Sequence, residues 1–147
     1  MLIVRNMQMS DAVEIAKLEK STFSDAWTEK GILDTFRQQQ AFVVVGEMGE
    51  KVVGYCIMYY VLDEGEIARI AVDGTCKRQG VGRAILKQVE AICKEKEITR
   101  ILLDVREGNA TARAFYRNYG FVEDGIRKNF YEMPKEHAVL MSKDVCW

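Results

Sequence analysis

Apolar residues recur at helical spacing in several parts of the chain. Val81, Ile85, Val89 and Ile92 follow one another at intervals of three or four residues, which is typical of a helix that buries one face. We expect further helices to begin behind three residues of capping type: Ser10, Thr28 and Asn109. The last of these should span residues 110–119. The pattern therefore predicts about four helices.

Runs of β-branched and aromatic residues predict the strands. Residues 41–48 and 51–62 are two such runs with only Gly49 and Glu50 between them, which is typical of a hairpin. Three further strands are expected near the two ends of the chain, at residues 2–6, 121–127 and 137–145. This part of the sheet should be antiparallel.

The order of elements changes in the middle of the chain. A strand at residues 65–72 precedes the helix at 81–97, and another strand follows at 99–105. Strand, helix and strand in this order predict a parallel pair joined by a right-handed crossover. We therefore expect an α/β (α+β) fold, with a mixed, mostly antiparallel twisted sheet of six to seven strands flanked by about four helices.

The composition excludes several classes of protein. The 147 residues have the length of one domain, which we place at residues 1–147, and we expect a monomer or a weak homodimer. No apolar run approaches the roughly 18 residues that span a bilayer. The first residues lack a signal-peptide pattern, so we expect a cytoplasmic protein without membrane contact. The 21 basic and 22 acidic residues provide no general positive field for direct nucleic-acid binding, and four cysteines without C-x-x-C spacing favour free thiols and no metal.

A glycine-rich segment lies between the strand at 65–72 and the helix at 81–97. Residues 77–83 read K-R-Q-G-V-G-R, and their two glycines let the backbone approach a ligand closely. A helix start favours anions through its free N–H groups and its positive dipole end, and the basic side chains suit phosphate oxygens. The segment predicts a diphosphate site, although a glycine-rich turn that opens an ordinary helix would have the same composition.

Two other phosphate-binding loops fit this segment poorly. A Walker loop requires G-x-x-x-x-G-K-[ST], which the chain lacks. The dinucleotide fingerprint G-x-G-x-x-G begins correctly at Gly80 but has Ile85 where its third small residue belongs. The preceding half of the chain is also predicted to form antiparallel hairpins instead of repeated βαβ units.

Three motifs follow one another at residues 69–86, 102–109 and 114–121. They are R-I-A-V-D leading into the glycine-rich segment, L-L-D-V-R followed by an asparagine, and A-F-Y-R-N-Y-G-F. Together they resemble the GNAT superfamily of acyl-CoA N-acyltransferases, and within it the bacterial ribosomal-protein alanine N-acetyltransferases. The resemblance also includes residues 23–29 and 127–131. It implies the GNAT fold and transfer of an acetyl group from acetyl-CoA to a primary amine, with a protein N-terminus, such as that of a ribosomal protein, as the acceptor partner.

The resemblance also assigns the acetyl-CoA site. Its strand residues would line the acetyl and pantetheine arm, the glycine-rich segment would hold the pyrophosphate, and Asn109 would contact the cofactor. The residues implied are Ile70, Ala71, Val72, Lys77, Arg78, Gln79, Gly80, Val81, Gly82, Arg83, Asn109 and Tyr116. The family usually begins this loop with Arg or Gln, so Lys77 should preserve the charge without the planar fork of arginine.

The chemistry of acetyl transfer requires a base for the amine and an acid for the departing thiolate. The resemblance places the base at Asp104, where close relatives carry glutamate, and the acid at Tyr116. Because aspartate is one methylene shorter, a bridging water or another carboxylate would have to help, and Glu66 on the neighbouring strand is the alternative base. Each acid could instead be a solvated or ion-paired strand residue, and Tyr116 could be one more packing aromatic.

The acceptor is less defined by the sequence. Tyr131 matches a family position that encloses the acceptor's amino terminus, and Phe23 and Trp27 could form the opposite wall, although aromatics at a helix junction are often core. Glu66 could also attract a cationic amine. Three functions remain open: acetylation of a protein N-terminus, acetylation of a small-molecule amine or a lysine side chain, and a non-catalytic CoA-binding module.

Overall fold

The computed structural model describes residues 1–77 and 79–145, which form seven strands, four α-helices and two short 3-10 helices. The strands are β1 (Leu2–Asn6), β2 (Ala41–Met48), β3 (Lys51–Val61), β4 (Glu64–Val72), β5 (Arg100–Arg106), β6 (Val122–Glu132) and β7 (Lys135–Asp144). The α-helices are α1 (Ala12–Thr22), α2 (Glu29–Phe36), α3 (Val81–Glu95) and α4 (Ala110–Tyr119). The 3-10 helices are Met9–Asp11 and Gly74–Cys76.

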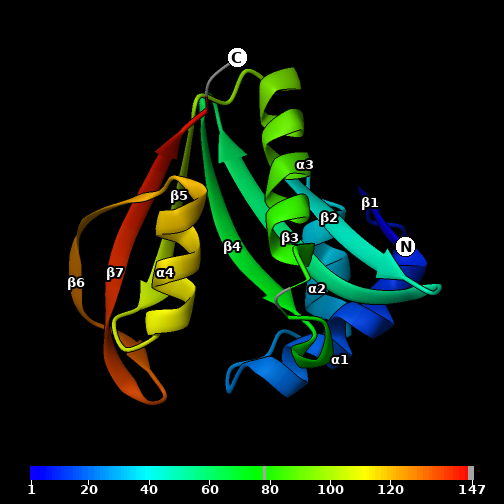
Figure 1. Ribbon diagram of the computed structural model, residues 1–147, viewed down its shortest axis with the longest axis horizontal. Coiled ribbons are helices and arrows are strands. Elements are labelled where there is room, and N and C mark those ends of the chain that lie inside the picture. The colour runs from blue at the N-terminus through cyan, green and yellow to red at the C-terminus, as the bar shows by residue number, and fades with distance from the viewer. Residues whose placement is uncertain (78, 146–147) are drawn as a thin grey trace.

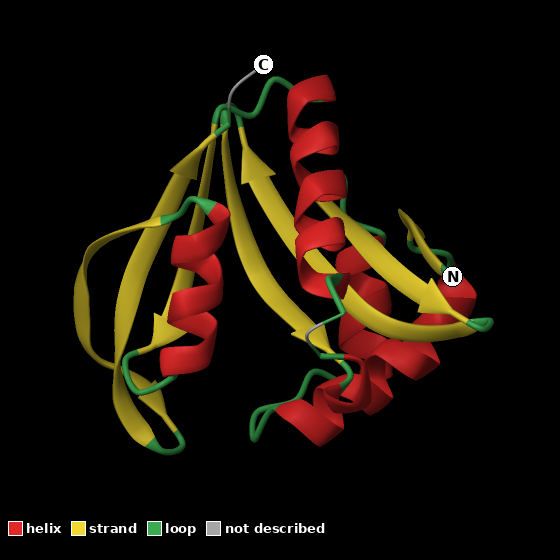
Figure 2. Cartoon of the chain, viewed as in Figure 1, coloured by secondary structure: helices red, strands yellow, loops and turns green. Residues whose placement is uncertain are grey.

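The seven strands form one twisted sheet in the order β1-β2-β3-β4-β5-β7-β6. Neighbouring strands are antiparallel except β4 and β5, which are parallel and are connected through α3. The mixed, mostly antiparallel sheet and the four helices confirm the predicted fold class (Figures 1 and 2).

Helices cover both faces of this sheet (Figure 2). Helix α3 buries the side chains of Val81, Ile85, Val89 and Ile92, as their spacing predicted, in a core that also contains Tyr116 of α4. Helices α1 and α2 pack on the opposite face, in a second core. The sheet is therefore the middle layer of three, and each face has its own apolar core.

The sheet opens between its two parallel strands. Pairing of β4 with β5 covers Glu64–Ile67 opposite Arg100–Leu103 and continues no further in the described residues. Beyond this point the two strands diverge (Figure 1). A register shift between β3 and β4 leaves Ala68 as an extra residue at the same level, because Ile67 pairs with Met58 and Arg69 with Ile57. The backbone groups of residues 68–72 that face β5 therefore have no strand partner there.

The local predictions were correct at most turns and wrong at two places. Gly49 and Glu50 have φ of 57° and 62°, as a tight hairpin requires. Ser10 does not cap a helix; it lies inside the 3-10 helix, and the Asp11 carboxylate accepts the Gln8 N–H at 2.7 Å instead. The strand expected at residues 121–127 extends to Glu132, because β6 is an exposed edge strand without an apolar alternation to mark its end.

Three further observations concern the described residues. None of their helices is both long and apolar enough to cross a membrane. No three His, Cys, Asp or Glu side chains among them gather as metal ligands would. The thiols of Cys56, Cys76 and Cys93 are free, whereas Cys146 lies outside the described part of the chain.

Candidate active site

The start of α3 has the features of an anion site. Gly80 precedes the helix with φ of 79°, a conformation that strains any residue with a Cβ, and its N-cap position makes no side-chain cap hydrogen bond in the described part of the chain. Lys77, Gln79 and Arg83 are exposed around this helix start. Arg78, the remaining basic residue predicted here, lies outside the described residues. Free N–H groups and two cationic side chains therefore surround one helix terminus.

The second glycine allows α3 to approach α4. A Cβ on Gly82 would lie 3.0 Å from Cζ of Phe115, which is tighter than nearly all such contacts. Val81 is buried at 2% exposure, so its side chain belongs to the core and only its backbone is available to a ligand. Glycine is therefore favoured at the two positions for different reasons: the backbone conformation at Gly80 and the close packing of α3 against α4 at Gly82.

The sides of the opening are formed by β4 and by the start of α4. Ile70 and Val72 are partly buried against the core beneath α3 and α4, whereas Ala71 packs into the core beneath α1. Asn109 caps α4, as predicted, by accepting the Ala112 N–H at 3.1 Å. Its side-chain NH₂ group remains as a donor toward a ligand.

Tyr116 lies on the face of the sheet that α3 and α4 cover. It is 6% exposed, and its ring packs edge-on against Phe115 and Phe121 at centroid distances of 5.4 and 5.5 Å. Burial raises the pKa of Tyr116 well above its ordinary value, with smaller contributions from Cys56 and Tyr131. The phenol therefore keeps its proton through neutral pH.

Asp104 lies on the opposite face, because the alternating residues Leu103 and Val105 point into the core under α3 and α4. Its Oδ1 atom is buried and accepts no hydrogen bond from the residues that the structure describes. The nearest cation is Arg127, with Nε 3.8 Å from Oδ1. Burial raises the pKa of Asp104, and the Arg127 charge only partly opposes this. A buried acceptor without a donor is costly in a purely structural role.

Tyr131 is the predicted acceptor residue whose environment includes this carboxylate. Burial, followed by the charge of Asp104, raises the pKa of Tyr131 to about 12, and the Arg106 guanidinium lies 4.2 Å from the centre of its ring. Phe23 and Trp27 lie in the loop between α1 and α2, which we call the acceptor loop (residues 23–28), and both pack against the core beneath α1.

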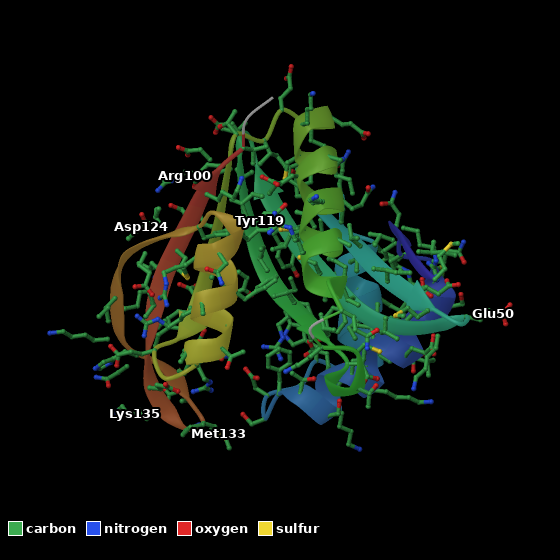
Figure 3. The ribbon with its side chains drawn as sticks, viewed as in Figure 1. Glu50, Arg100, Tyr119, Asp124, Met133 and Lys135 are labelled. Atoms are coloured by element: carbon green, nitrogen blue, oxygen red, sulfur yellow. The ribbon has the colours of Figure 1, made fainter. Side chains whose placement is uncertain are left out.

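The acceptor loop is joined to the opposite edge of the same face. Ser24 donates a hydrogen bond of 2.8 Å to the carbonyl oxygen of Met133, at the tip of the β6–β7 hairpin. Figure 3 shows Met133 and Lys135 at this tip. Arg106 holds the hairpin from the other side, donating to the carbonyls of Met133 and Pro134 at 3.1 and 2.8 Å. Two loops far apart in the sequence therefore meet over the face that carries Asp104.

Glu66 is placed less favourably than Asp104. It pairs with Leu102 across the parallel strands, so it shares the face of Asp104 two residues further along the sheet. Its side chain is exposed and lines a hollow of about 370 Å³ beside the β3–β4 turn.

Sequence reasoning missed the arginines of this face. Arg106 and Arg127 contact Tyr131 and Asp104, and although both lie within segments that carry the family resemblance, the resemblance assigned neither of them a role. Arg69 does carry a signal, because it is a charged residue within an apolar strand. These contacts join residues from different strands, so the sequence gives no sign of which partner each arginine has.

An opening between parallel strands, an anion site at the start of α3, and a carboxyl and a phenol group on the two faces of the sheet are the features expected of an acyl-CoA-dependent acyltransferase. The chain belongs to the acetyltransferase (GNAT) family, which it matches over residues 12–121. It is an N-acetyltransferase, as its relatives' names also state.

Several relatives share more than the fold. A Bacillus subtilis (strain 168) protein provisionally named as a ribosomal protein bS18-alanine N-acetyltransferase is 32% identical over 94% of this chain and 92% of its own. The Escherichia coli (strain K12) ribosomal protein bS18-alanine N-acetyltransferase is 29% identical, with 95% of each chain covered. The crystal structure of the Escherichia coli ribosomal-protein-S18-alanine N-acetyltransferase has a TM-score of 0.90 at 28% identity and covers 100% of this chain and 96% of its own.

Proposed function

We propose that this protein transfers the acetyl group of acetyl-CoA to the N-terminal α-amine of a protein, with Asp104 as the general base and Tyr116 as the general acid. The observation that carries the proposal is the buried Oδ1 of Asp104, which has no hydrogen-bond donor among residues 1–77 and 79–145. An acceptor ammonium would supply that donor. Asp104 is preferred to Glu66 because only its oxygen is buried without a partner.

The residues present fit acetyl-CoA. Free N–H groups at the start of α3, with Lys77 and Arg83 nearby, suit its pyrophosphate. The unpaired edge of β4 at residues 68–72 suits the amide groups of its pantetheine arm, which could hydrogen-bond as a short strand would. Asn109 adds a donor at the far side of the opening. When bound, acetyl-CoA supplies an acetyl group activated as a thioester.

The two proton transfers involve residues on opposite faces of the sheet. Asp104 takes the proton of the acceptor amine as its nitrogen forms the new bond to the acetyl carbon, and Tyr116 gives its proton to the sulfur as the carbon–sulfur bond breaks. The α-amine has an ordinary pKa of about 7.7–8.0, so a carboxylate whose pKa burial has raised is a sufficient base. The raised pKa of Tyr116 keeps the acid protonated.

The acceptor class rests on relatives and on geometry. Relatives named as acting on ribosomal protein bS18 alanine match the chain over almost its whole length. A lysine ammonium, with an ordinary pKa of about 10.4, requires a stronger base than an α-amine does. The Ser24–Met133 hydrogen bond also joins the acceptor loop to the β6–β7 hairpin over the face that carries Asp104, and a slender chain end would suit a site beneath such a link.

Thiol release from acetyl-CoA tests the proposal. The acceptors are a peptide that begins with free alanine, the same peptide with a blocked N-terminus and an internal lysine, and a panel of small amines. We expect the first to be the fastest acceptor. Faster turnover of the lysine peptide or of a small amine would overturn the proposed acceptor. Tight CoA binding without any turnover would make the chain a binding module.

Variants separate the two candidate bases. Asp104→Asn should lose more turnover than Glu66→Gln with the best acceptor, because Asp104 holds the buried oxygen. The opposite order would assign the base to Glu66.

A further inference from the structure

Arg69 is an unusual residue for its position. It lies on β4 between Ala68 and Ile70, both partly buried, and its own side chain is only 13% exposed. The register shift at Ala68 turns Arg69 toward the face that α1 and α2 cover. A guanidinium is costly to bury unless partners satisfy its donors, so its contacts indicate why it is there.

The first partner is a buried carboxylate on α1. Glu19 is fully buried, and Arg69 Nη2 donates to its Oε1 at 2.7 Å, while Nε lies 3.1 and 3.2 Å from the two carboxylate oxygens. The same carboxylate accepts the hydroxyl of Tyr55 and the backbone N–H of Trp27, the latter at 2.9 Å. Glu19 therefore ties β3, β4 and the acceptor loop together at one point.

The other partners belong to the acceptor loop. The guanidinium carbon lies 4.0 Å from the ring centre of Phe23 and 5.7 Å from that of Trp27. Nη2 also contacts the side chain and the carbonyl of Asp25, both at 3.3 Å. Arg69 thus touches three of the six loop residues through a planar group that stacks and donates at once.

The loop in turn bounds the acceptor face. The charge of Asp25 raises the pKa of Tyr131 slightly and that of Arg69 lowers it slightly. Ser24 in the same loop reaches Met133 across that face. A residue that fixes the loop therefore fixes one wall of the space next to Asp104.

We propose that Arg69 is a positioning residue for the acceptor: its ion pair with Glu19 and its stacking on Phe23 hold the acceptor loop in the conformation that binds the amine substrate. The Arg69 side chain points to the face that α1 and α2 cover, whereas the proposed cofactor arm would meet only the backbone edge of β4 at residues 68–72. Loss of this side chain should therefore weaken acceptor binding without weakening acetyl-CoA binding.

This inference rests on the proposed function only in placing the acceptor on the face of Asp104. The test uses the amine that the wild-type protein acetylates fastest in the panel above. The identity of the acceptor is therefore decided before Arg69 is varied, and failure of one proposal is distinguishable from failure of the other.

The experiment compares steady-state kinetics of Arg69→Gln, Arg69→Lys and the wild-type protein. We expect Arg69→Gln to raise the acceptor KM about tenfold, with the acetyl-CoA KM unchanged within about twofold and a smaller change in kcat. Arg69→Lys keeps the charge but loses the planar fork and the stacking on Phe23, so its acceptor KM should lie between those of the wild-type protein and Arg69→Gln. If Arg69→Gln does not fold, Arg69→Lys and Phe23→Leu, which loses the stacked ring, still measure the acceptor KM.

The matched control is Arg5→Gln. Arg5 makes a comparable two-pronged ion pair with Asp11, at 2.8 and 2.9 Å, just before α1 and away from the acceptor loop. The substitution Arg5→Gln should lower the melting temperature and leave the acceptor KM unchanged. The proposal is overturned if Arg69→Gln changes the acceptor KM by less than about twofold, raises both KM values together, or behaves as Arg5→Gln does.

Discussion

At the scale of single residues, the buried oxygen of Asp104 has a cation at 3.8 Å, too far for a hydrogen bond, and this arrangement lowers stability. Burial raises its pKa, so the folded state holds the proton more tightly than the unfolded chain does. The free energy of unfolding therefore falls as the pH rises from the unfolded-state pKa of Asp104 to its higher folded-state pKa, and the loss is complete above the folded-state pKa. We expect Asp104→Asn to stabilise the fold at pH 7 by about 1 kcal/mol, with a gain that shrinks as the pH falls toward the ordinary carboxyl range.

Thermal unfolding between pH 5 and 8 measures this effect. Asp34→Asn is the control, because Asp34 is 52% exposed and pairs only with Lys30 at the surface. A lower melting temperature for Asp104→Asn at pH 7 would mean that the carboxylate supports the fold. If Asp104→Asn is more stable than the wild-type protein but has a lower kcat, Asp104 is kept for function at a cost in stability.

Tyr116 offers a second test at this scale, because its ring and its hydroxyl have different tasks. Phenylalanine preserves the packing against Phe115 and Phe121 but removes the proton donor. We expect Tyr116→Phe to lower kcat by about 100-fold, with the KM for acetyl-CoA and the melting temperature little changed. Tyr60→Phe is the control, since the Tyr60 hydroxyl bonds only the Gln39 carbonyl, at 3.2 Å. Equal kcat values for Tyr116→Phe and wild type would exclude the general-acid role.

At the scale of elements, the start of α3 depends on backbone conformation. Gly80 has φ of 79° with open space around it, so alanine would be strained there without any clash. We expect Gly80→Ala to cost about 1 kcal/mol and to raise the KM for acetyl-CoA, leaving the acceptor KM unchanged. Gly74→Ala in the preceding 3-10 helix meets neither a positive φ nor a neighbour within 4 Å, and is the matched control. Equal cofactor KM values for the two variants would contradict the anion site.

The elements also show which parts of the fold the sequence could predict. Helix α3 follows from its apolar spacing, and the parallel pair follows from the order of β4, α3 and β5. The end of β6 could not be predicted, because an exposed edge strand is selected for neither burial nor alternation. The 3-10 helix at Met9–Asp11 was missed for a different reason. Arg5 and Gln8 both donate hydrogen bonds to Asp11, so Asp11 and not Ser10 accepts the backbone N–H at this helix start.

The same distinction applies to the site. The glycine-rich segment and the residues at 104 and 116 could be proposed from the sequence because they lie in the motifs that resemble the family. The charge of Arg69 within an apolar strand is visible in the sequence, but its role is not, because that role depends on Glu19, 50 residues earlier, and on a register shift without a local sequence pattern. Burial of Oδ1 in Asp104 likewise appears only when the strands are assembled.

At the scale of the whole molecule, the sheet consists of two parts joined by a short seam. Four residues of β4 pair with four of β5, and beyond them the strands separate. The closed end is reinforced by Glu90 of α3, which accepts bonds from Tyr119 of α4 at 2.5 Å and from Lys143 of β7 at 2.7 Å. Tyr119 is labelled at the end of α4 in Figure 3. The open end has no comparable link on that face in the described residues.

A ligand that lies in the opening should therefore stabilise the whole fold by joining its two parts. At 100 times its dissociation constant, acetyl-CoA would add about 2.7 kcal/mol, which corresponds to a rise of roughly 5–10 °C in melting temperature for a chain of this length. Hydrogen exchange should slow along residues 68–72 and 104–106, where the strands lack mutual pairing. ADP is the control ligand, because it carries the pyrophosphate without the pantetheine arm and should protect only the start of α3. If acetyl-CoA protected the start of α3 alone, the arm would not lie between β4 and β5, and the placement of the acetyl group between Asp104 and Tyr116 would be wrong.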